Sequence, residues 1–397
     1  MNRRQFIRTG AACGLFPAVV GTTESRPARD DSASDSVALA CGRRVVNQAQ
    51  YDDGSTPAAS PTYEPVTMSV DPTTVEEITA GRTLAGELRT RLDGLTEHQS
   101  ATGADSGRLR VSRRSTDDGI RLVVDCPSGV DTTCIKEAVK TTTGRFLERT
   151  NGWLSKRDRN VDVRVQDRPT ERFEADCRGT VSRFADARYR KHGVAMGAAI
   201  RSETVGEIAS TGFRGLRDGR AVVVTTAHTF AREDDYAAAD LRGVELYQSR
   251  QPHGVGRCHA AGETVDAAAV AVDTDTYPSR YLADPGGNSY DDRPIVGTAT
   301  WAALEAAHAE GDPIYKQGAV SGRCEGRITE LMESSDGPRE LGVDIHSTGG
   351  DSGGPYFLEA DEGLLVAGIH KGVRPETGQR RAVFVGSVLD TLGVDVY

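Results

Sequence analysis

One serine near the end of the chain has the surroundings of a nucleophile. Ser352 lies within residues 347–355, where an aspartate precedes it, a glycine pair stands on each side of this Asp-Ser dipeptide and a proline follows. Glycine and proline at these positions disfavour the interior of a helix or a strand. They favour a tight turn that exposes the serine hydroxyl and leaves backbone N–H groups unpaired. Such N–H groups can receive the oxyanion that forms during acyl transfer.

A serine hydroxyl is a weak nucleophile, so it needs a histidine base and an aspartate that orients the histidine. His228 ends an apolar run of β-type residues, and Asp266 opens another. Asp273 and Asp275 are competing acids. Asp266 is preferred because it alone directly precedes an apolar run. The chain therefore offers the three groups of a catalytic triad.

The order His, Asp, Ser in these local contexts resembles the chymotrypsin-like serine proteases over about the last half of the chain. The sequence is most similar to the streptogrisin and α-lytic type, and three further stretches carry this likeness: residues 318–329, 366–370 and 392–397. The resemblance implies an all-β catalytic domain over residues 185–397, built from two antiparallel six-stranded β-barrels and ending in a short helix. The first barrel would supply the histidine and the aspartate, and the second barrel the serine.

The resemblance also assigns a role to each of these residues. His228 would take the proton of the Ser352 hydroxyl and later donate it to the leaving amine. Asp266 would fix the imidazole tautomer, and the N–H groups of Gly350 and Ser352 would form the oxyanion hole. This chemistry needs no cofactor and no metal, and no paired CxxC or HExxH spacing indicates a zinc site.

His370 is the residue that we expect to determine substrate specificity. Its segment, together with Ser347 and Thr348, is similar to the glutamyl endopeptidases, in which a histidine and nearby hydroxyls receive a substrate carboxylate. A histidine near its pKa suits that task, and Lys371 would add positive charge. The alternative is that His370 packs in a pocket wall and the enzyme prefers small or apolar side chains.

The sequence also departs from the family pattern. The cysteine that usually follows the catalytic histidine is absent, because Thr229 and Phe230 stand there. Lys371 occupies a position where a small hydroxyl residue often supports the triad aspartate. The triad itself is complete, so these departures leave the expected chemistry intact and affect the shape of the pocket.

The N-terminal residues predict export. Arg3 and Arg4, followed by Phe6 and a short apolar run, resemble a Tat signal peptide over residues 1–30. Residues 31–66 are rich in Ser, Thr, Asp, Pro and Gly, which predicts a flexible linker. We therefore expect a secreted or cell-surface protein.

Residues 67–175 predict a small α+β domain. Apolar residues recur at helical spacing from Asp71 onward, two strand-like runs follow, and then a second helix over residues 132–154 and a strand over residues 161–165. By position this domain is either a pro-region that assists folding or inhibits the protease, or a permanently attached accessory domain.

Six cysteines remain beyond the signal segment, an even number that favours disulfides in an exported protein. The sequence suggests two pairs, Cys258 with Cys324 in the catalytic half and Cys126 with Cys134 in the preceding domain.

Composition restricts the partners. The 397 residues carry a formal net charge of −10, which disfavours nucleic acid because phosphate binding needs a basic surface. No stretch reaches the roughly 18 apolar residues of a membrane span. The sequence thus predicts a secreted serine endopeptidase acting on proteins or peptides. The alternative hypothesis is that the protein is a catalytically silent, protease-like binding protein.

Overall fold

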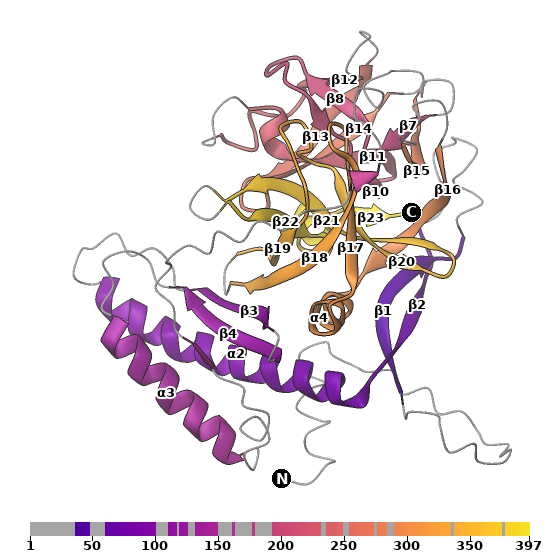
Figure 1. The fold of residues 1–397 in the computed structure, drawn as a ribbon. Helices are drawn as coiled ribbons and strands as arrows, with labels where there is room; N and C mark the ends of the chain where they lie inside the picture. Colours follow the sequence, from indigo (N-terminus) through magenta and orange to yellow (C-terminus); the bar gives the residue numbers. More distant parts are fainter. Residues whose placement is uncertain are drawn as a thin grey trace, which may run out of the picture.

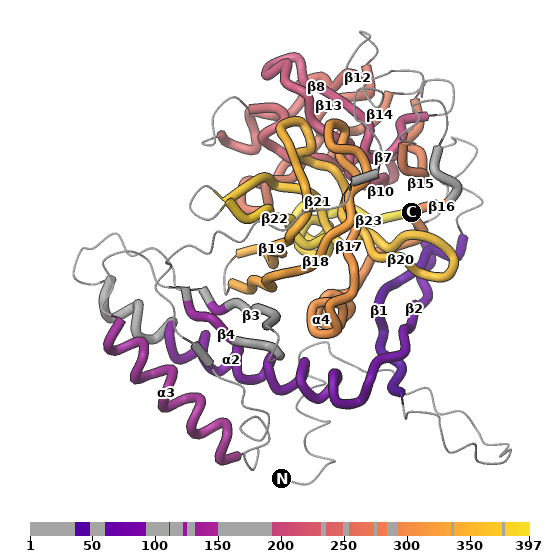
Figure 2. Tube along the Cα trace, viewed as in Figure 1, coloured from indigo at the N-terminus to yellow at the C-terminus, as the bar shows by residue number. Residues whose placement is uncertain are grey.

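A computed structural model describes most of the C-terminal half and the main elements of the N-terminal half (Figures 1 and 2). The described residues are 36–47, 60–100, 110–116, 119–125, 132–149, 161–162, 177–178, 193–231, 236–248, 254–273, 276–283, 290–334, 337–374 and 378–397. The proposed signal peptide lies outside them. Within them, no helix is both long and apolar enough to cross a membrane.

The first β unit of the C-terminal half is one curled sheet with the strand order β23-β10-β11-β14-β13-β12-β8-β9. Its strands are β8 (Ala199–Ser202), β9 (Ala209–Ser210), β10 (Arg214–Arg217), β11 (Arg220–Thr225), β12 (Glu245–Gln248), β13 (Gly254–Gly262), β14 (Ala267–Val272) and β23 (Asp395–Val396). All of its pairings are antiparallel. The central strands β11 and β14 consist largely of Val and Ala, because both faces of each strand are buried.

The second β unit is a closed antiparallel barrel. Its six strands pair in the ring β17-β18-β19-β22-β21-β20 and back to β17. They are β17 (Pro313–Gly318), β18 (Gly322–Glu333), β19 (Glu340–Asp344), β20 (Pro355–Ala360), β21 (Gly363–Val373) and β22 (Arg380–Phe384). Strand β16 (Tyr290–Ala299) runs parallel to β21, and β15 (Pro278–Ala283) pairs with both β16 and β7 (Val194–Met196).

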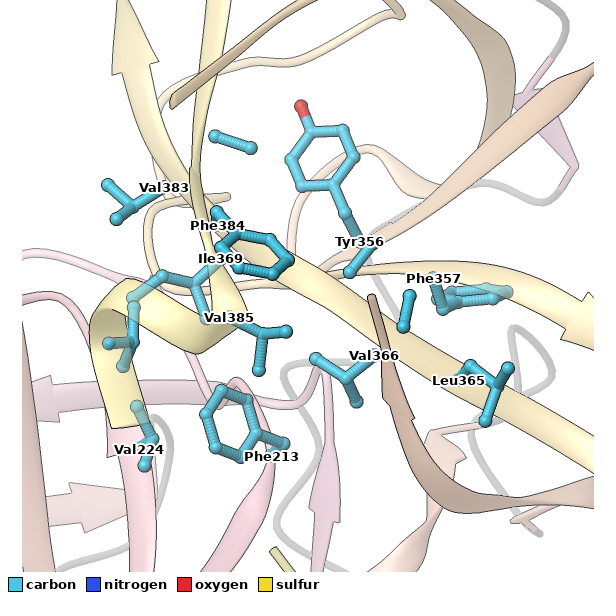
Figure 3. Packing of buried hydrophobic residues seen from close by; sticks show 14 of the residues in the cluster. Phe213, Val224, Tyr356, Phe357, Leu365, Val366, Ile369, Val383, Phe384 and Val385 are labelled. Carbon is cyan, nitrogen blue, oxygen red and sulfur yellow. The ribbon is translucent and has the colours of Figure 1, made fainter. Parts of the chain in front are cut away.

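The two units share one hydrophobic core. Phe213 and Val224 of the first unit belong to the same buried cluster as Val366 and Val385 of the second (Figure 3). The C-terminal helix α5 (Val385–Leu392) is present as expected. The expected chymotrypsin-like architecture is therefore confirmed, with one difference. The second unit is a six-stranded barrel, whereas the first is a curled sheet that also includes the C-terminal strand β23.

The N-terminal half contains the expected α+β unit. It consists of α2 (Pro72–Ser100), β3 (Arg110–Thr116), β4 (Gly119–Asp125), α3 (Thr132–Arg149) and β5 (Val161–Asp162). Leu84 and Leu88 of α2 and Phe146 of α3 pack against Leu122 and Val124 of β4 in a separate core. The helical spacing and the turn between the two strands thus predicted these elements correctly.

The expected flexible linker over residues 31–66 is wrong in part. Residues of this segment form β1 (Val37–Val45) and the start of β2 (Tyr63–Val70), which pair as a hairpin. β1 also pairs with β16, and the Thr300 N–H donates to the Cys41 carbonyl at 2.8 Å. The small and charged residues along β1 do not form the alternating apolar pattern that predicts a strand. A partner strand about 250 residues away forms the other side of the ladder, and such tertiary context overrides local propensity.

The α+β unit extends the sheet of the second barrel. β3 pairs with β18, with Arg113 opposite Leu331, and β6 (Cys177–Arg178) pairs with the other end of β18. Cys324 lies opposite Cys177 in that pairing, a position from which a disulfide can form. Cys258 is a free thiol, so the expected pairing of Cys258 with Cys324 is wrong. The other expected pairing, Cys126 with Cys134, includes a residue outside the described part of the chain and stays a prediction.

A buried ion pair joins the two halves. Glu305 on α4 (Trp301–Glu310) is fully buried and pairs with Arg82 of α2. We expect Arg82→Met to lower the free energy of unfolding by about 3 kcal/mol, because the variant removes the cation that pairs with the buried Glu305 carboxylate. Denaturant unfolding measures the loss. Arg149→Met is the control, since Arg149 is 60 % exposed in its pair with Glu87 and such pairs contribute at most about 1 kcal/mol. Equal effects of the two changes would contradict the prediction.

Candidate active site

His228 and Asp266 meet because two neighbouring strands run in opposite directions. β11 and β14 pair with Thr225 opposite Ala268, so the end of β11 lies beside the start of β14. His228 follows β11 in a short 3₁₀ helix (Ala227–Thr229), and Asp266 directly precedes β14. The structure therefore brings together the two side chains that the sequence singled out from their strand ends.

The contact between them is well formed. Oδ2 of Asp266 lies 2.7 Å from Nδ1 of His228, and Oδ1 accepts the backbone N–H of His228 at 3.0 Å. The Asp266 side chain is 13 % exposed and that of His228 is 31 % exposed. The aspartate is thus shielded from water, while the histidine stays accessible to a substrate. Of the competing acids, Asp273 is exposed and Asp275 lies outside the described residues.

Asp351, next to the candidate nucleophile, is fully buried and satisfied by four donors. Its Oδ2 accepts from Nζ of Lys316 at 2.6 Å and from the Thr348 N–H at 3.0 Å. Its Oδ1 accepts the N–H groups of Val320 and Ser321 at 3.0 and 2.9 Å. Burial by itself would raise the pKa of Asp351, but the Lys316 ammonium and the hydrogen bonds hold that pKa below its ordinary value. The carboxylate therefore anchors the turn of residues 347–354.

Two backbone amides of this anchored turn have no hydrogen-bond partner among the described residues. The Asp351 N–H donates to the Thr348 carbonyl at 3.1 Å. The N–H groups on either side, those of Gly350 and Ser352, take part in none of the hydrogen bonds among the residues that the structure describes. Gly350 has φ +99°, and a Cβ there would lie 2.4 Å from the Val320 side chain, so only glycine fits. Unpaired backbone amides are the donors that an oxyanion hole requires.

Ser352 lies at the interface of the two β units. Its carbonyl accepts the N–H of Ser210 at 2.7 Å, and the Ser210 hydroxyl donates to the Gly350 carbonyl at 2.8 Å. Ser210 belongs to β9, and Thr225, at the end of β11, donates to its carbonyl at 2.8 Å. The serine turn is therefore fixed to the strands that lead to His228. Among the described residues, the Ser352 hydroxyl makes no hydrogen bond, and such bonds are often long before substrate binds.

His370 is completely enclosed. Its Nδ1 lies 3.1 Å from the hydroxyl of Tyr356, a residue of the buried cluster drawn in Figure 3. Burial, together with repulsion from Lys316, lowers the pKa of His370 to about 3. The expectation of a histidine that titrates near neutral pH is therefore wrong, because desolvation disfavours the imidazolium.

The other expected specificity residues differ in their surroundings. Ser347 is buried, and its hydroxyl has no hydrogen-bond partner in the described part of the chain. Thr348 is exposed. Lys371 does not serve as the expected source of charge for the pocket, because its Nζ pairs with Glu340 at 3.1 Å. Within the described residues, no group of three His, Cys, Asp or Glu side chains is placed to hold a metal ion.

Sequence reasoning missed three residues of this site. Lys316 holds Asp351, Ser210 holds the serine turn, and the Tyr236 hydroxyl donates to Oδ1 of Asp266 at 3.1 Å. A signal existed only for Lys316, which is one of six lysines in the chain and interrupts a β-type run. A buried lysine requires an anionic partner. Ser210 and Tyr236 belong to no motif.

Among known proteins, the chain is similar to solved structures. No family model matches the chain, and no curated protein sequence does. Among solved structures it is similar to a glutamic acid-specific serine protease described as using a histidine triad in substrate binding, with 24% identity, a TM-score of 0.38 and coverage of 51% of this chain and 100% of that one. Thermobifida fusca protease A matches at 16% identity and a TM-score of 0.37, covering 51% of this chain and 97% of that protein. An α-lytic protease homologue matches at 18% identity and a TM-score of 0.36, covering 51% and 99%. The strand pairings give the C-terminal half a chymotrypsin-like fold of two β units.

Proposed function

We propose that the protein is a serine endopeptidase that acts through His228, Asp266 and Ser352. The observation that carries the proposal is the close His228–Asp266 contact on one β unit, together with the free amides of Gly350 and Ser352 on the other. An imidazole oriented by a carboxylate and a preformed oxyanion receptor are the two requirements of acyl transfer by a serine.

In the proposed reaction, Oγ of Ser352 attacks the peptide carbonyl carbon while Nε2 of His228 takes its proton. The carbonyl oxygen becomes an oxyanion between the N–H groups of Gly350 and Ser352. The C–N bond then breaks, the amine leaves with the proton from His228, and an acyl-enzyme remains. Water, deprotonated by His228, releases the acid and restores the serine.

Digestion of a peptide library by the full chain tests the proposal. We expect cleavage that falls about 10⁶-fold in Ser352→Ala, with both proteins folded as judged by circular dichroism. Cleavage that persists in the variant would overturn the assignment of the nucleophile. Intact peptides with both proteins would instead favour the silent binding protein.

We propose further that the enzyme prefers glutamate or aspartate before the scissile bond. The support comes from the unpartnered hydroxyl of Ser347 and from the Tyr356–His370 pair. Burial raises the pKa of Tyr356, which keeps its hydroxyl protonated. When this hydroxyl donates to Nδ1 of His370, the ring proton stays on Nε2, where a neutral imidazole can donate to a carboxylate. The glutamic acid-specific neighbour favours the same preference.

Paired substrates that differ only in Glu or Gln at that position measure this preference. We expect Ser347→Ala to lower the Glu-to-Gln ratio of kcat/KM about tenfold, because a hydrogen bond to a charged group is lost. Ser387→Ala, a serine that accepts the Arg339 N–H, is the control. In the native enzyme the ratio should stay constant from pH 5 to pH 8, because a folded pKa of about 3 keeps His370 neutral throughout. A ratio that falls as the pH rises through about 6.5 would indicate a titrating His370.

For the N-terminal half, we propose a permanent accessory unit rather than a removable pro-region. β1 occupies the edge of β16, and Cys41 belongs to the main core of the C-terminal half. The Tyr63 hydroxyl donates to the Val396 carbonyl at 2.7 Å. Removal of this half would expose these apolar surfaces and leave Glu305 without Arg82. The expected instability of Arg82→Met tests this proposal, since a dispensable unit would tolerate the change.

A further inference from the structure

Asp266 receives more hydrogen bonds than its contact with the imidazole requires. Oδ2 faces Nδ1 of His228, whereas Oδ1 accepts both the His228 N–H and the Tyr236 hydroxyl. Among the residues that the structure describes, the Tyr236 hydroxyl is the one donor to the Asp266 carboxylate that does not belong to His228. A second element thus fixes the carboxylate.

The segment that carries Tyr236 is tied to the turn that carries Asp266. The Ala238 N–H donates to Oε1 of Glu263 at 2.7 Å, and the Asp266 N–H donates to the Glu263 carbonyl at 3.0 Å. The Tyr236 ring packs against the buried cluster of the first β unit, which includes Phe230 and Ala268. The hydroxyl therefore reaches Asp266 from a segment that is held at both its backbone and its ring.

The aspartate needs such support. Asp266 has φ +48°, a left-handed conformation that is uncommon for residues other than glycine, asparagine and aspartate. The terminal torsion of an aspartate is broad, so its carboxylate plane is poorly fixed by the side chain itself. A carboxylate that rotated away from Nδ1 would leave the imidazole free to turn and to adopt the wrong tautomer.

We propose that Tyr236 is a positioning residue, which holds the carboxylate plane of Asp266 so that Nδ1 of His228 keeps its proton and Nε2 faces the nucleophile. This inference rests on the proposed peptidase function for its kinetic consequence. Its structural consequence, the state of the proton between His228 and Asp266, does not depend on peptidase activity.

Tyr236→Phe removes the hydroxyl and keeps the ring. We expect kcat to fall about tenfold, the effect of losing one hydrogen bond to a charged group, with KM and the thermal unfolding midpoint unchanged. The Nδ1 proton of His228, identified in the proton NMR spectrum by its absence from His228→Gln, should shift and exchange faster with water. Tyr247→Phe is the matched control, because Tyr247 also donates to a carboxylate, that of Glu245, on the same sheet.

Each outcome bears on the proposal. A Tyr236→Phe protein with native kcat and an unchanged Nδ1 resonance would overturn the positioning role and leave the peptidase assignment intact. An equal loss of kcat in Tyr247→Phe would also overturn it, because the effect would then be a general one on the sheet. If the native chain hydrolyses no peptide, the peptidase proposal fails, and a shifted resonance confined to Tyr236→Phe still supports the positioning of Asp266.

Discussion

Replacement of Asp266 by asparagine is expected to lower kcat about 10⁴-fold with little change in KM. Oδ1 of Asp266 accepts from the His228 N–H and from the Tyr236 hydroxyl, and of these two groups the backbone N–H can only donate. The amide oxygen of asparagine must therefore stay there, and its NH₂ group faces Nδ1 of His228. Nδ1 then becomes an acceptor, the ring proton moves to Nε2, and the imidazole can no longer take the proton of Ser352.

The backbone should not contribute to this loss, because asparagine tolerates the left-handed conformation of Asp266 as well as aspartate does. Asp273→Asn is the matched control. It makes the same chemical change at the exposed acid beyond the other end of β14. Steady-state kinetics on a cleaved peptide compares the two variants. Similar kcat values for Asp266→Asn and the native enzyme would exclude Asp266 from the triad.

Loss of the Lys316 ammonium is expected to affect both catalysis and stability. Lys316 and Asp351 are each fully buried and lie 2.6 Å apart. Lys316→Met keeps the volume and leaves the Asp351 carboxylate without its cation, a change that costs about 3–5 kcal/mol of unfolding free energy. Asp351 also orients the amides of Gly350 and Ser352. We therefore expect the kcat of Lys316→Met to fall about 10² to 10³-fold, the approximate effect of losing an oxyanion donor.

The acid limb of the stability curve gives a second measure of this pair. Because the folded pKa of Asp351 lies below its unfolded value, the pair stabilises the fold above the unfolded pKa, and this contribution is lost as the pH falls through the folded pKa. Lys316→Met lacks this contribution, so its unfolding free energy should fall less than that of the native protein on acidification, and the difference between the two proteins should narrow at low pH. Lys371→Met removes the same charge from the partly exposed pair with Glu340 and serves as the control. Equal acid sensitivity of the native protein and Lys316→Met would contradict the prediction.

Local patterns predicted the site residues whose surroundings are determined by their neighbours in the sequence. Ser352 lies in a glycine-rich turn, and His228 and Asp266 lie at the ends of apolar runs. The antiparallel pairing of β11 with β14 then brings the last two together. The double β architecture and the α+β unit could be predicted in the same way, because strand alternation, helical spacing and turn residues are local signals.

Contacts between distant segments could not be predicted in this way. Asp351 and Lys316 are 35 residues apart, and Asp266 and Tyr236 are 30 residues apart. Nothing in either sequence neighbourhood indicates that the two members of each pair meet. The strand β1 was overlooked for the same reason, since β16 completes its ladder. The pKa of His370 depends on full burial in the folded chain, which the local motif does not indicate.

The most direct test of the proposed mechanism is the site of covalent modification by a fluorophosphonate. Such a reagent phosphonylates a serine only where a base activates the hydroxyl and an oxyanion site receives the P=O group. Mass spectrometry of the treated full-length protein should locate one adduct on Ser352. In the His228→Gln variant, Ser352 should react with the reagent at least 10³-fold more slowly. An adduct on another residue, or a folded protein that leaves Ser352 unmodified, would contradict the assignment of Ser352 as the nucleophile.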